Sequence, residues 1–317
     1  MNIYFSNVSK NLIVINVELM NIRGVNSGFL RNIDIVIFDV KKIKYKTSLE
    51  YAKTIFIKIE LVNYFMENIF HLINHKCTII IGGGDITFPK NIDKRYFKTH
   101  TDISISNLNK LTNSKFINNI FVENLMCSLP KTYPIPLGIN PFECSTNLNY
   151  FLKFINIDKN KPLKFTNFNR VRDGKGQWEE RSYVKNLCRK YWNKYFIETD
   201  ITSHKNYLTK MSSYLFTICV HGGGLDVNPK LWEALIVGVI PIIKENKPYT
   251  DIYVNLDFPV VIVKNWNSDT INENNLLSWY NKYYIYFTDN IKRKQLIMKL
   301  SLNFWLKYIS SDHIHDF

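Results

Sequence analysis

The sequence predicts an α/β protein with two Rossmann-like domains, each built on a parallel sheet. Short apolar, β-branched runs alternate along the chain with segments of helical period, which is typical of parallel strands joined by covering helices. The 317 residues are enough for two domains of ordinary size, each with its own core. We expect an N-terminal domain over residues 1–155 and a C-terminal domain over residues 156–317, with the last helix packing back on the first domain.

The first half contains strand-like runs at residues 11–17, 33–40, 54–59 and 77–81. The third run leads directly into an amphipathic helix over residues 61–73. Polar residues dominate 86–115, which predicts a loop with a poorly defined helix, and residues 115–125 predict another strand-helix element. Four prolines within residues 130–141 enforce extended backbone, so this segment predicts a strand end and a connection between the domains.

The second half continues the alternation. Strands are predicted at residues 162–169, 215–220, 239–243 and 260–263, and helices at 178–196, 204–211, 229–237, 274–286 and 290–309. One helix has boundaries marked by independent signals, because Asn228 is a good N-cap, Pro229 suits the first helical position and Gly238 suits the position after the last turn. Pro241 in the following strand implies an end or bulge position.

The segment HGGGLDVNPK, residues 221–230, joins a strand to this helix. The helix N-terminus points out of the carboxyl edge of the predicted sheet, and the glycines let backbone approach a ligand closely, which suits an anion such as a phosphate. Lys230 adds a positive charge, and Glu233 on the same helix face accepts hydrogen bonds from ribose or sugar hydroxyls. The candidate residues are His221, Gly222, Gly223, Gly224, Asp226, Asn228, Lys230 and Glu233. The alternative is an ordinary βα turn whose glycines only permit tight packing.

A second basic loop, residues 169–176, follows the first strand of the second domain and opens a helix. Asn169, Arg170, Arg172 and Arg181 are therefore candidates to face the same anion as Lys230. The loop does not fit the phosphate-loop pattern, and a solvated basic loop is the alternative.

Two acidic residues of the first half follow strands, and both are candidate general bases. Glu60 closes the run that begins at Thr54, and Asp85 follows residues 77–81, so both side chains project at the carboxyl edge where open α/β sheets bind ligands. An N-cap or Asx turn is the alternative for each. The segment GGGD, residues 82–85, lacks the glycine spacing of the dinucleotide fingerprint.

Composition narrows the classes of protein and partner. With 46% apolar and 15% aromatic residues, the chain is globular rather than disordered. The formal net charge of +14 favours an anionic partner. Each half carries +7, from 18 basic and 11 acidic residues in 1–155 and from 23 and 16 in the rest. The charge is therefore spread evenly, and the sequence lacks the isolated basic module that would indicate nucleic-acid binding.

The sequence lacks a run long enough for a spanning helix, and the N-terminus lacks the pattern of a signal peptide. We expect a cytoplasmic protein, in the host cytoplasm if a virus encodes it, whose basic surface permits peripheral membrane contact. No metal site is expected, because the five cysteines are widely spaced without a paired-cysteine motif, which is typical of reduced thiols. His313 and His315 belong to a segment that predicts a frayed end.

The segment HGGGLDVNPKLWEALIVGVIPIIK, residues 221–244, resembles the donor-domain signature of exostosin-like glycosyltransferases and related viral and bacterial sugar transferases of the GT-B fold. The matching residues are Asp226, Lys230, Trp232, Glu233, Ala234, Leu235, Gly238, Ile240 and Pro241. The family more often has arginine at the position of Lys230 and a different loop at 221–224. Weaker similarities extend to TIFIKIELVNYFMENIF, CTIIIGGGD, YPIPLGIN and FTNFN.

The resemblance implies a GT-B-like fold whose two domains face a cleft, with a nucleotide sugar bound mainly by the second domain and the acceptor by the first. It implies no required metal and no cofactor besides the sugar donor. The expected function is transfer of a sugar from a nucleotide diphosphate sugar to a hydroxyl of a glycan or glycoconjugate. For an inverting reaction, Asp85 is the first choice of base and Glu60 the second.

Two other functions stay open at this point. The segment IIIGGGD, residues 79–85, is faintly similar to polysaccharide pyruvyltransferases, which would use phosphoenolpyruvate. A non-catalytic protein that binds glycans, nucleic acids or other anions is the second alternative, because folds can lose chemistry. A lipase-like use of His-Gly-Gly-Gly is excluded, because the chain has no Gly-x-Ser-x-Gly nucleophile elbow.

Overall fold

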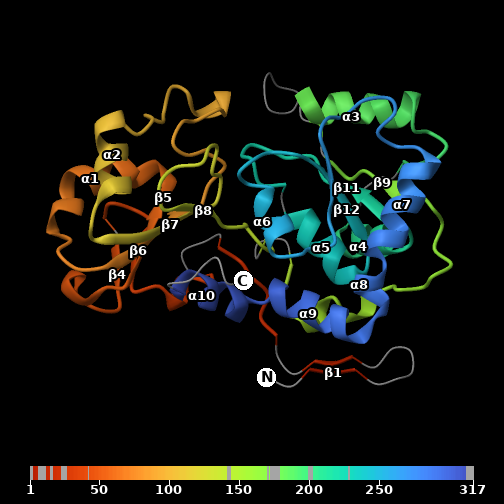
Figure 1. Cartoon of the computed structure of the whole chain (residues 1–317), viewed down its shortest axis with the longest axis horizontal. Coiled ribbons are helices and arrows are strands. Elements are labelled where there is room, and N and C mark those ends of the chain that lie inside the picture. Colours follow the sequence, from red (N-terminus) through yellow and green to blue (C-terminus); the bar gives the residue numbers. More distant parts are fainter. Residues whose placement is uncertain are drawn as a thin grey trace.

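The computed structural model confirms an α/β protein with two sheets of mostly parallel strands, one of six strands and one of five. It describes residues 3–5, 12–14, 17–22, 27–41, 43–140, 144–169, 171, 179–198, 203–227 and 229–311. Each sheet forms the centre of its own lobe, and the two lobes lie side by side (Figure 1). No helix among the described residues is long and apolar enough to cross a bilayer.

The N-terminal lobe is built on the six-stranded sheet, in the order β4-β3-β5-β6-β7-β8. These strands are β3 (Ile35–Ile37), β4 (Ile43–Tyr45), β5 (Thr54–Lys58), β6 (Cys77–Gly82), β7 (Ile117–Val122) and β8 (Thr132–Pro134). Only β4 is antiparallel to its neighbour. Side chains alternate between the two faces, so Ile79 and Ile81 belong to one core cluster and Ile80 to the other. Both faces are buried, as the continuous apolar runs predict.

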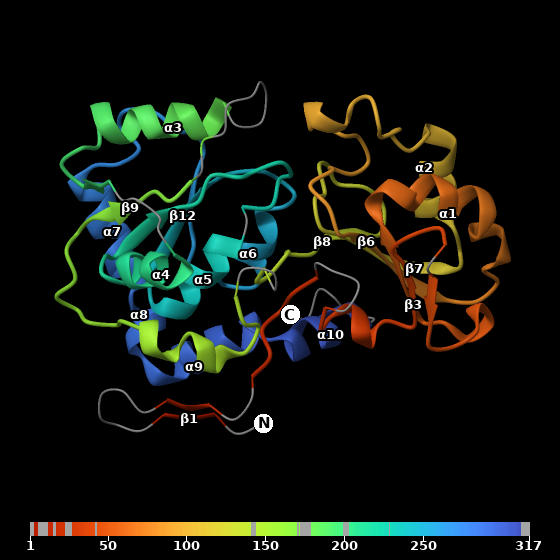
Figure 2. The ribbon, with the colours of Figure 1, turned by 180° about the vertical axis from the view of Figure 1, so that it is seen from behind.

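Different helices cover the two faces of this sheet. On one face, α1 (Val62–Asn68) and α2 (Ile105–Asn113) share a core cluster with Ile79 and Ile81. On the other face lies α10 (Leu302–Ser310), and the rings of Tyr308 and Phe121 are 5.7 Å apart. Figure 1 and Figure 2 show α10 on the side of the sheet opposite α1 and α2. A helix from the end of the chain therefore completes the core of the first lobe.

The C-terminal lobe is built on the five-stranded sheet, in the order β10-β9-β11-β12-β13 with all strands parallel. These strands are β9 (Phe165–Thr166), β10 (Phe196–Ile197), β11 (Phe216–Ile218), β12 (Ile240–Lys244) and β13 (Val261–Val263). The chain reverses its direction of progress between β9 and β11. This is the switch point of an open α/β sheet, and ligands of such sheets bind beyond the strand ends there.

Seven helices of the described chain surround the second sheet. They are α3 (Glu179–Lys190), α4 (His204–Ser212), α5 (Pro229–Val237), α6 (Asp251–Asn255), α7 (Glu273–Tyr283), α8 (Ile285–Thr288) and α9 (Asn290–Leu300). Every residue from Lys230 to Val237 of α5 is buried. The helix ends at Gly238, whose φ of +87° is the left-handed conformation that favours glycine. The sequence signals for the end of this helix are thus confirmed.

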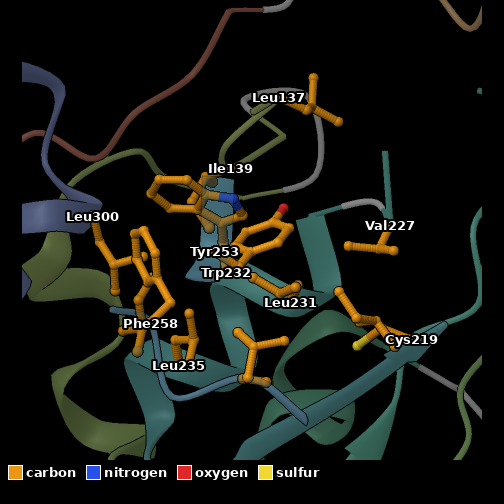
Figure 3. Packing of buried hydrophobic residues seen from close by; sticks show 14 of the residues in the cluster. Leu137, Ile139, Cys219, Val227, Leu231, Trp232, Leu235, Tyr253, Phe258 and Leu300 are labelled. Carbon is orange, nitrogen blue, oxygen red and sulfur yellow. The ribbon is translucent and has the colours of Figure 1, made fainter. Parts of the chain in front are cut away.

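Trp232 of α5 packs where the two lobes meet. Its ring lies 6.3 Å from that of Phe258 and 6.1 Å from that of Trp305 in α10. Figure 3 shows Trp232 and Phe258 together with Leu137 and Ile139, which belong to the connection between the lobes (residues 135–160). The buried α5 therefore supports the second sheet, the connection and α10 at once.

Several predicted elements are shorter or interrupted. The helix predicted over 290–309 breaks at Ser301, whose extended backbone and hydroxyl cap α10. The helix predicted over 178–196 ends at Lys190, and Phe196 pairs with Phe165 as strand β10. The helices predicted over 61–73 and 274–286 are each interrupted near their C-terminal end, at Ile69 and Tyr284.

The remaining differences concern short elements. Strand β2 (Leu12–Val14) pairs with β1 (Ile3–Phe5) in a separate two-stranded sheet. Residues 115–125 provide β7 but no helix. Elements β1, β4 and α6 were not predicted, because each is shorter than the window over which periodicity is informative. Pro241 lies at the amino end of β12, before the ladder with β13 begins at Ile242, as an end position requires.

Candidate functional site

The candidate site lies where the glycine loop after β11 contacts the carboxyl edge of the first sheet. Asn124, which follows β7, accepts hydrogen bonds from the backbone N–H groups of Leu225 at 2.9 Å and Asp226 at 3.0 Å. Its amide nitrogen donates to the carbonyl of Gly84 at 2.9 Å. One buried side chain thus joins the glycine segments of both lobes. The sequence analysis missed Asn124, because nothing near it in sequence marks this long-range contact.

At two glycines of the loop, side chains of the other lobe occupy the space that a Cβ would need. A Cβ at Gly223 would lie 2.3 Å from Arg95 Nη2 and 2.7 Å from the carboxylate of Asp85, and a Cβ at Gly224 would lie 2.2 Å from Asn124 Oδ1. The sequence analysis assigned these glycines to the approach of a ligand. In the structure, the close approach at both positions is made by protein side chains. Gly222, which is half-buried, lies just before this contact.

Asp85 and Glu60 both lie at the carboxyl edge of the first sheet, where they were expected. Asp85 accepts a hydrogen bond from Arg95 at 2.8 Å, and Arg95 also binds the buried Asp93. Glu60 lies 3.3 Å from the amine of Lys58. A Cβ on Gly84 would lie 3.5 Å from Glu60 Oε1, so the two acidic residues flank this glycine. Both side chains are partly exposed, at 28% and 33%.

Lys230 lies at the switch point of the second sheet. Its amine donates to Asn169 Oδ1 at 2.7 Å, and Asn169 also bridges the ends of β9 and β11 through Ile218 and Val220. Lys230 is buried, and its pKa is lowered to about 7: burial is the largest cause and the charge of Arg181 adds to it, while Cys219 and Glu233 oppose the shift. A negatively charged ligand here would restore the protonated amine.

Arg181 lies beside the same strand end. Its Nε donates to the carbonyl of His221 at 3.1 Å, and its guanidinium also lies near the carbonyl of Val220. The buried guanidinium therefore fixes the start of the glycine loop and brings a permanent positive charge close to Lys230. Arg170, Arg172 and Asn228 lie outside the described residues.

His221 belongs to a charged cluster with Glu180 and Lys244 that was not predicted from the sequence. Its Nε2 lies 2.7 Å from Glu180 Oε2, and Lys244 pairs with the other carboxylate oxygen. Burial raises the pKa of Glu180, but the hydrogen bonds and charges of His221 and Lys244 outweigh burial and lower the pKa overall. With Trp266 and Asn246, these residues line a cavity of ≈ 10 Å³, about the room one water needs. Glu180 lies in the first turn of α3, where an acidic residue suits the helix dipole, and no motif in the sequence marks it as a site residue.

Glu233 is buried and its carboxylate is engaged by protein groups. Tyr207 donates its hydroxyl to Oε2 at 2.6 Å, and His204 Nε2 lies 2.9 Å from Oε1. The other ring nitrogen of His204 lies 3.0 Å from the hydroxyl of Tyr150. The sequence analysis expected Glu233 to hold ribose or sugar hydroxyls at an open mouth. The observed packing gives that carboxylate only 3% exposure, so such a contact would require displacement of His204 or Tyr207.

Asp226 holds the connection between the lobes. Its Oδ2 accepts hydrogen bonds from the backbone N–H of Leu137 at 2.8 Å and from the hydroxyl of Tyr249. Burial raises the pKa of Tyr249 well above its ordinary value, and the adjacent carboxylate adds to this effect. Asp226 was expected among the donor-binding residues, and these contacts direct its carboxylate toward the protein interior.

Two groups of expected residues come together in the structure. Lys230, Asn169 and Arg181 converge at the switch point, while Asp85, Gly223 and Gly224 lie at the contact between the lobes. Glu60 flanks Gly84 within the first lobe, and His221, Asp226 and Glu233 are held by other contacts. Comparison with protein-family models and with curated proteins finds no match for the chain.

Proposed function

We propose that the protein is a glycosyltransferase that moves a sugar from a nucleotide diphosphate sugar to a hydroxyl of a glycan or glycoconjugate, without a metal ion in the transfer step. The observation that carries the proposal is the pairing of Lys230 with Asn169 at the switch point of the second sheet. It lies at the N-terminal turn of α5, beside Arg181. The likeness of residues 221–244 to exostosin-like enzymes supports the same function.

The proposed donor site stabilises the leaving diphosphate. Negative charge accumulates on the diphosphate as the glycosidic bond breaks, and the N-terminus of α5, Lys230 and Arg181 provide positive potential there. Since burial lowers the pKa of Lys230 to about 7, a part of the lysine population is neutral before binding. Binding of the diphosphate would draw a proton onto this amine, so donor binding is coupled to proton uptake.

The proposed acceptor site lies at the facing edge of the first sheet. In an inverting transfer, a carboxylate accepts the proton of the acceptor hydroxyl while the hydroxyl oxygen attacks the anomeric carbon. Asp85 is the first candidate because it lies against Gly223 of the opposite lobe, and Arg95 fixes its carboxylate. Glu60 is the second candidate. Glu233 is not given a donor contact, because His204 and Tyr207 occupy its oxygens.

The donor site is tested by thermal unfolding of the wild type and two lysine variants with a panel of nucleotide diphosphate sugars. A donor at a hundred times its dissociation constant stabilises the fold by about 2.7 kcal/mol. Lys230→Met should lose this shift. Lys161→Met is the matched control, because Lys161 is equally buried and its pKa is also lowered to about 7 by burial, but it binds the carbonyls of Asn156 and Gly238.

Three results would contradict the proposal. No shift with any nucleotide sugar removes the donor site altogether. Equal loss of the shift in Lys230→Met and Lys161→Met means that Lys230 acts only through stability. A shift with phosphoenolpyruvate alone would instead support a pyruvyl transfer.

A further inference from the structure

Three side chains that are distant in sequence converge beside helix α5. Cys144 comes from the connection between the lobes, His204 is the first residue of α4, and Glu233 lies in α5. One ligand atom from each lies within 4.8 Å of those of the other two. Glu233 is buried and the other two are half-buried. A thiol, an imidazole and a carboxylate are thus held together by three separate segments.

We propose that Cys144, His204 and Glu233 bind a zinc ion. Zinc takes thiolate, imidazole and carboxylate ligands, and a site with three protein ligands keeps a fourth position for water. The ion holds its ligand atoms about 3.3–3.7 Å apart, given bond lengths of about 2.0–2.3 Å. The ligand atoms lie within 4.8 Å of one another, so shifts of roughly 1 Å in side-chain position bring them to these separations.

Groups around the three ligands match those of protein zinc sites. Metal-bound histidines use their second ring nitrogen for a hydrogen bond that fixes the ring, and ligating carboxylates are hydrogen-bonded in turn. Here Nε2 of His204 faces Glu233, and Nδ1 lies 3.0 Å from the hydroxyl of Tyr150. Tyr207 donates to the remaining oxygen of Glu233 at 2.6 Å. Both outer partners are therefore in position.

The zinc site is separate from the proposed transfer reaction. It fastens the connection between the lobes to α4 and α5, because Cys144 belongs to that connection. Lys230, one turn before Glu233, points instead to Asn169. Zinc binding is therefore measured without any sugar donor, and failure of the donor site leaves this result untouched.

The test is zinc content and cobalt spectroscopy on the full chain. The wild type, purified without chelators, should carry about one zinc per chain, and Cys144→Ser and His204→Ala should lose it. Cobalt added to the metal-free wild type should give thiolate-to-metal charge-transfer absorption, which disappears in Cys144→Ser. Tyr150→Phe should weaken zinc binding by roughly tenfold or more, because it removes the partner of the imidazole.

Two control variants separate this site from unspecific binding. Cys127→Ser removes another partly exposed thiol, and His313→Ala with His315→Ala removes the histidines of the C-terminal segment. Both should keep the zinc content and the cobalt spectrum. Equal zinc in the wild type and Cys144→Ser would overturn the proposal. Absence of thiolate absorption in the cobalt-loaded wild type would do so even if the variants fail to fold.

Discussion

Gly224 and Asn124 lie in contact across the two lobes, so that a Cβ at Gly224 would be only 2.2 Å from Asn124 Oδ1. The same oxygen accepts hydrogen bonds from the N–H groups of Leu225 and Asp226. The glycine and the asparagine therefore form one unit: the missing side chain makes room for the amide, and the amide satisfies the backbone that follows. Gly223 and Gly224 therefore both serve the contact between the lobes.

This unit predicts that Gly224→Ala and Asn124→Ala each destabilise the fold. The alanine Cβ overpacks a filled contact, at about 1–3 kcal/mol, and loss of the amide leaves buried N–H groups without acceptors, at about 1–3 kcal/mol. The two effects should be non-additive, because the smaller residue at 124 makes room for the new methyl. Chemical denaturation of both variants and the double variant measures this. Asn109→Ala on the exposed side of α2 should stay within about 0.5 kcal/mol of the wild type; strict additivity would argue against the contact.

The lowered pKa of Lys230 predicts that the free energy of unfolding rises with pH above neutrality. Burial lowers its pKa from 10.5 to about 7. At a pH between these two pKa values, Lys230 is protonated in the unfolded chain and neutral in the native state. The free energy of unfolding therefore increases by up to about 1.4 kcal/mol per pH unit. Lys230→Met removes this contribution. Denaturation from near pH 7 to near pH 10 should therefore show a flatter profile for the variant.

The same pH profile reports on the ligand. A bound nucleoside diphosphate favours the protonated amine of Lys230, so it should flatten the profile of the wild type. It should do so equally in Lys161→Met, because Lys161 lies away from the switch point. A profile that the diphosphate leaves unchanged would show that no anion reaches Lys230.

Substitution of Asp85 should lower the rate of sugar transfer while the protein stays folded. If Asp85 accepts the acceptor proton, Asp85→Asn should lower kcat by about 10²–10⁴-fold while donor-induced thermal stabilisation persists. Glu60→Gln is the rival variant, and Glu67→Gln on the exposed surface of α1 is the control. Full activity of Asp85→Asn would exclude Asp85, and a large loss confined to Glu60→Gln would make Glu60 the base.

The hydrogen bond between Tyr249 and Asp226 predicts that substitution of Tyr249 destabilises the fold more than substitution of its neighbour Tyr253. The Tyr249 hydroxyl donates to the buried Asp226, and it also lies 3.1 Å from the hydroxyl of Tyr253. Tyr249→Phe removes a hydrogen bond to a charged group, at about 1.5–3 kcal/mol, whereas Tyr253→Phe removes a neutral one, at about 0.5–1.5 kcal/mol. Urea denaturation of both variants should give this order. Equal losses would mean that Asp226 does not depend on Tyr249.

The fold class follows from local patterns, which is why the sequence predicts it. Alternating runs and the Pro229 and Gly238 signals mark α5 because capping acts within one turn. The long helices were predicted without their breaks, since Ser301 ends one helix and caps the next through its own hydroxyl. Strand β10 has two residues and gains its pairing from Phe165, far away in the sequence.

The candidate site also contains features that local sequence decides and features that depend on distant segments. The carboxyl-edge positions of Asp85 and Glu60 and the strand-end position of Lys230 were predicted, because strand order and helix starts decide them. The use of Gly224 and the partners of Glu233 were not predicted. Both depend on side chains brought from other segments, Asn124 in the first case and His204 in the second.

The covering of the first sheet by α10 affects the order in which the protein can be assembled during synthesis. The strands of the N-terminal lobe leave the ribosome first, yet the Phe121 face of their sheet packs against Tyr308. The part of that face against α10 stays uncovered until residues 302–310 have been made. The lobe translated first is therefore the one completed last, and the nascent chain leaves the part of the sheet around Phe121 without its helix while the second lobe is being synthesised.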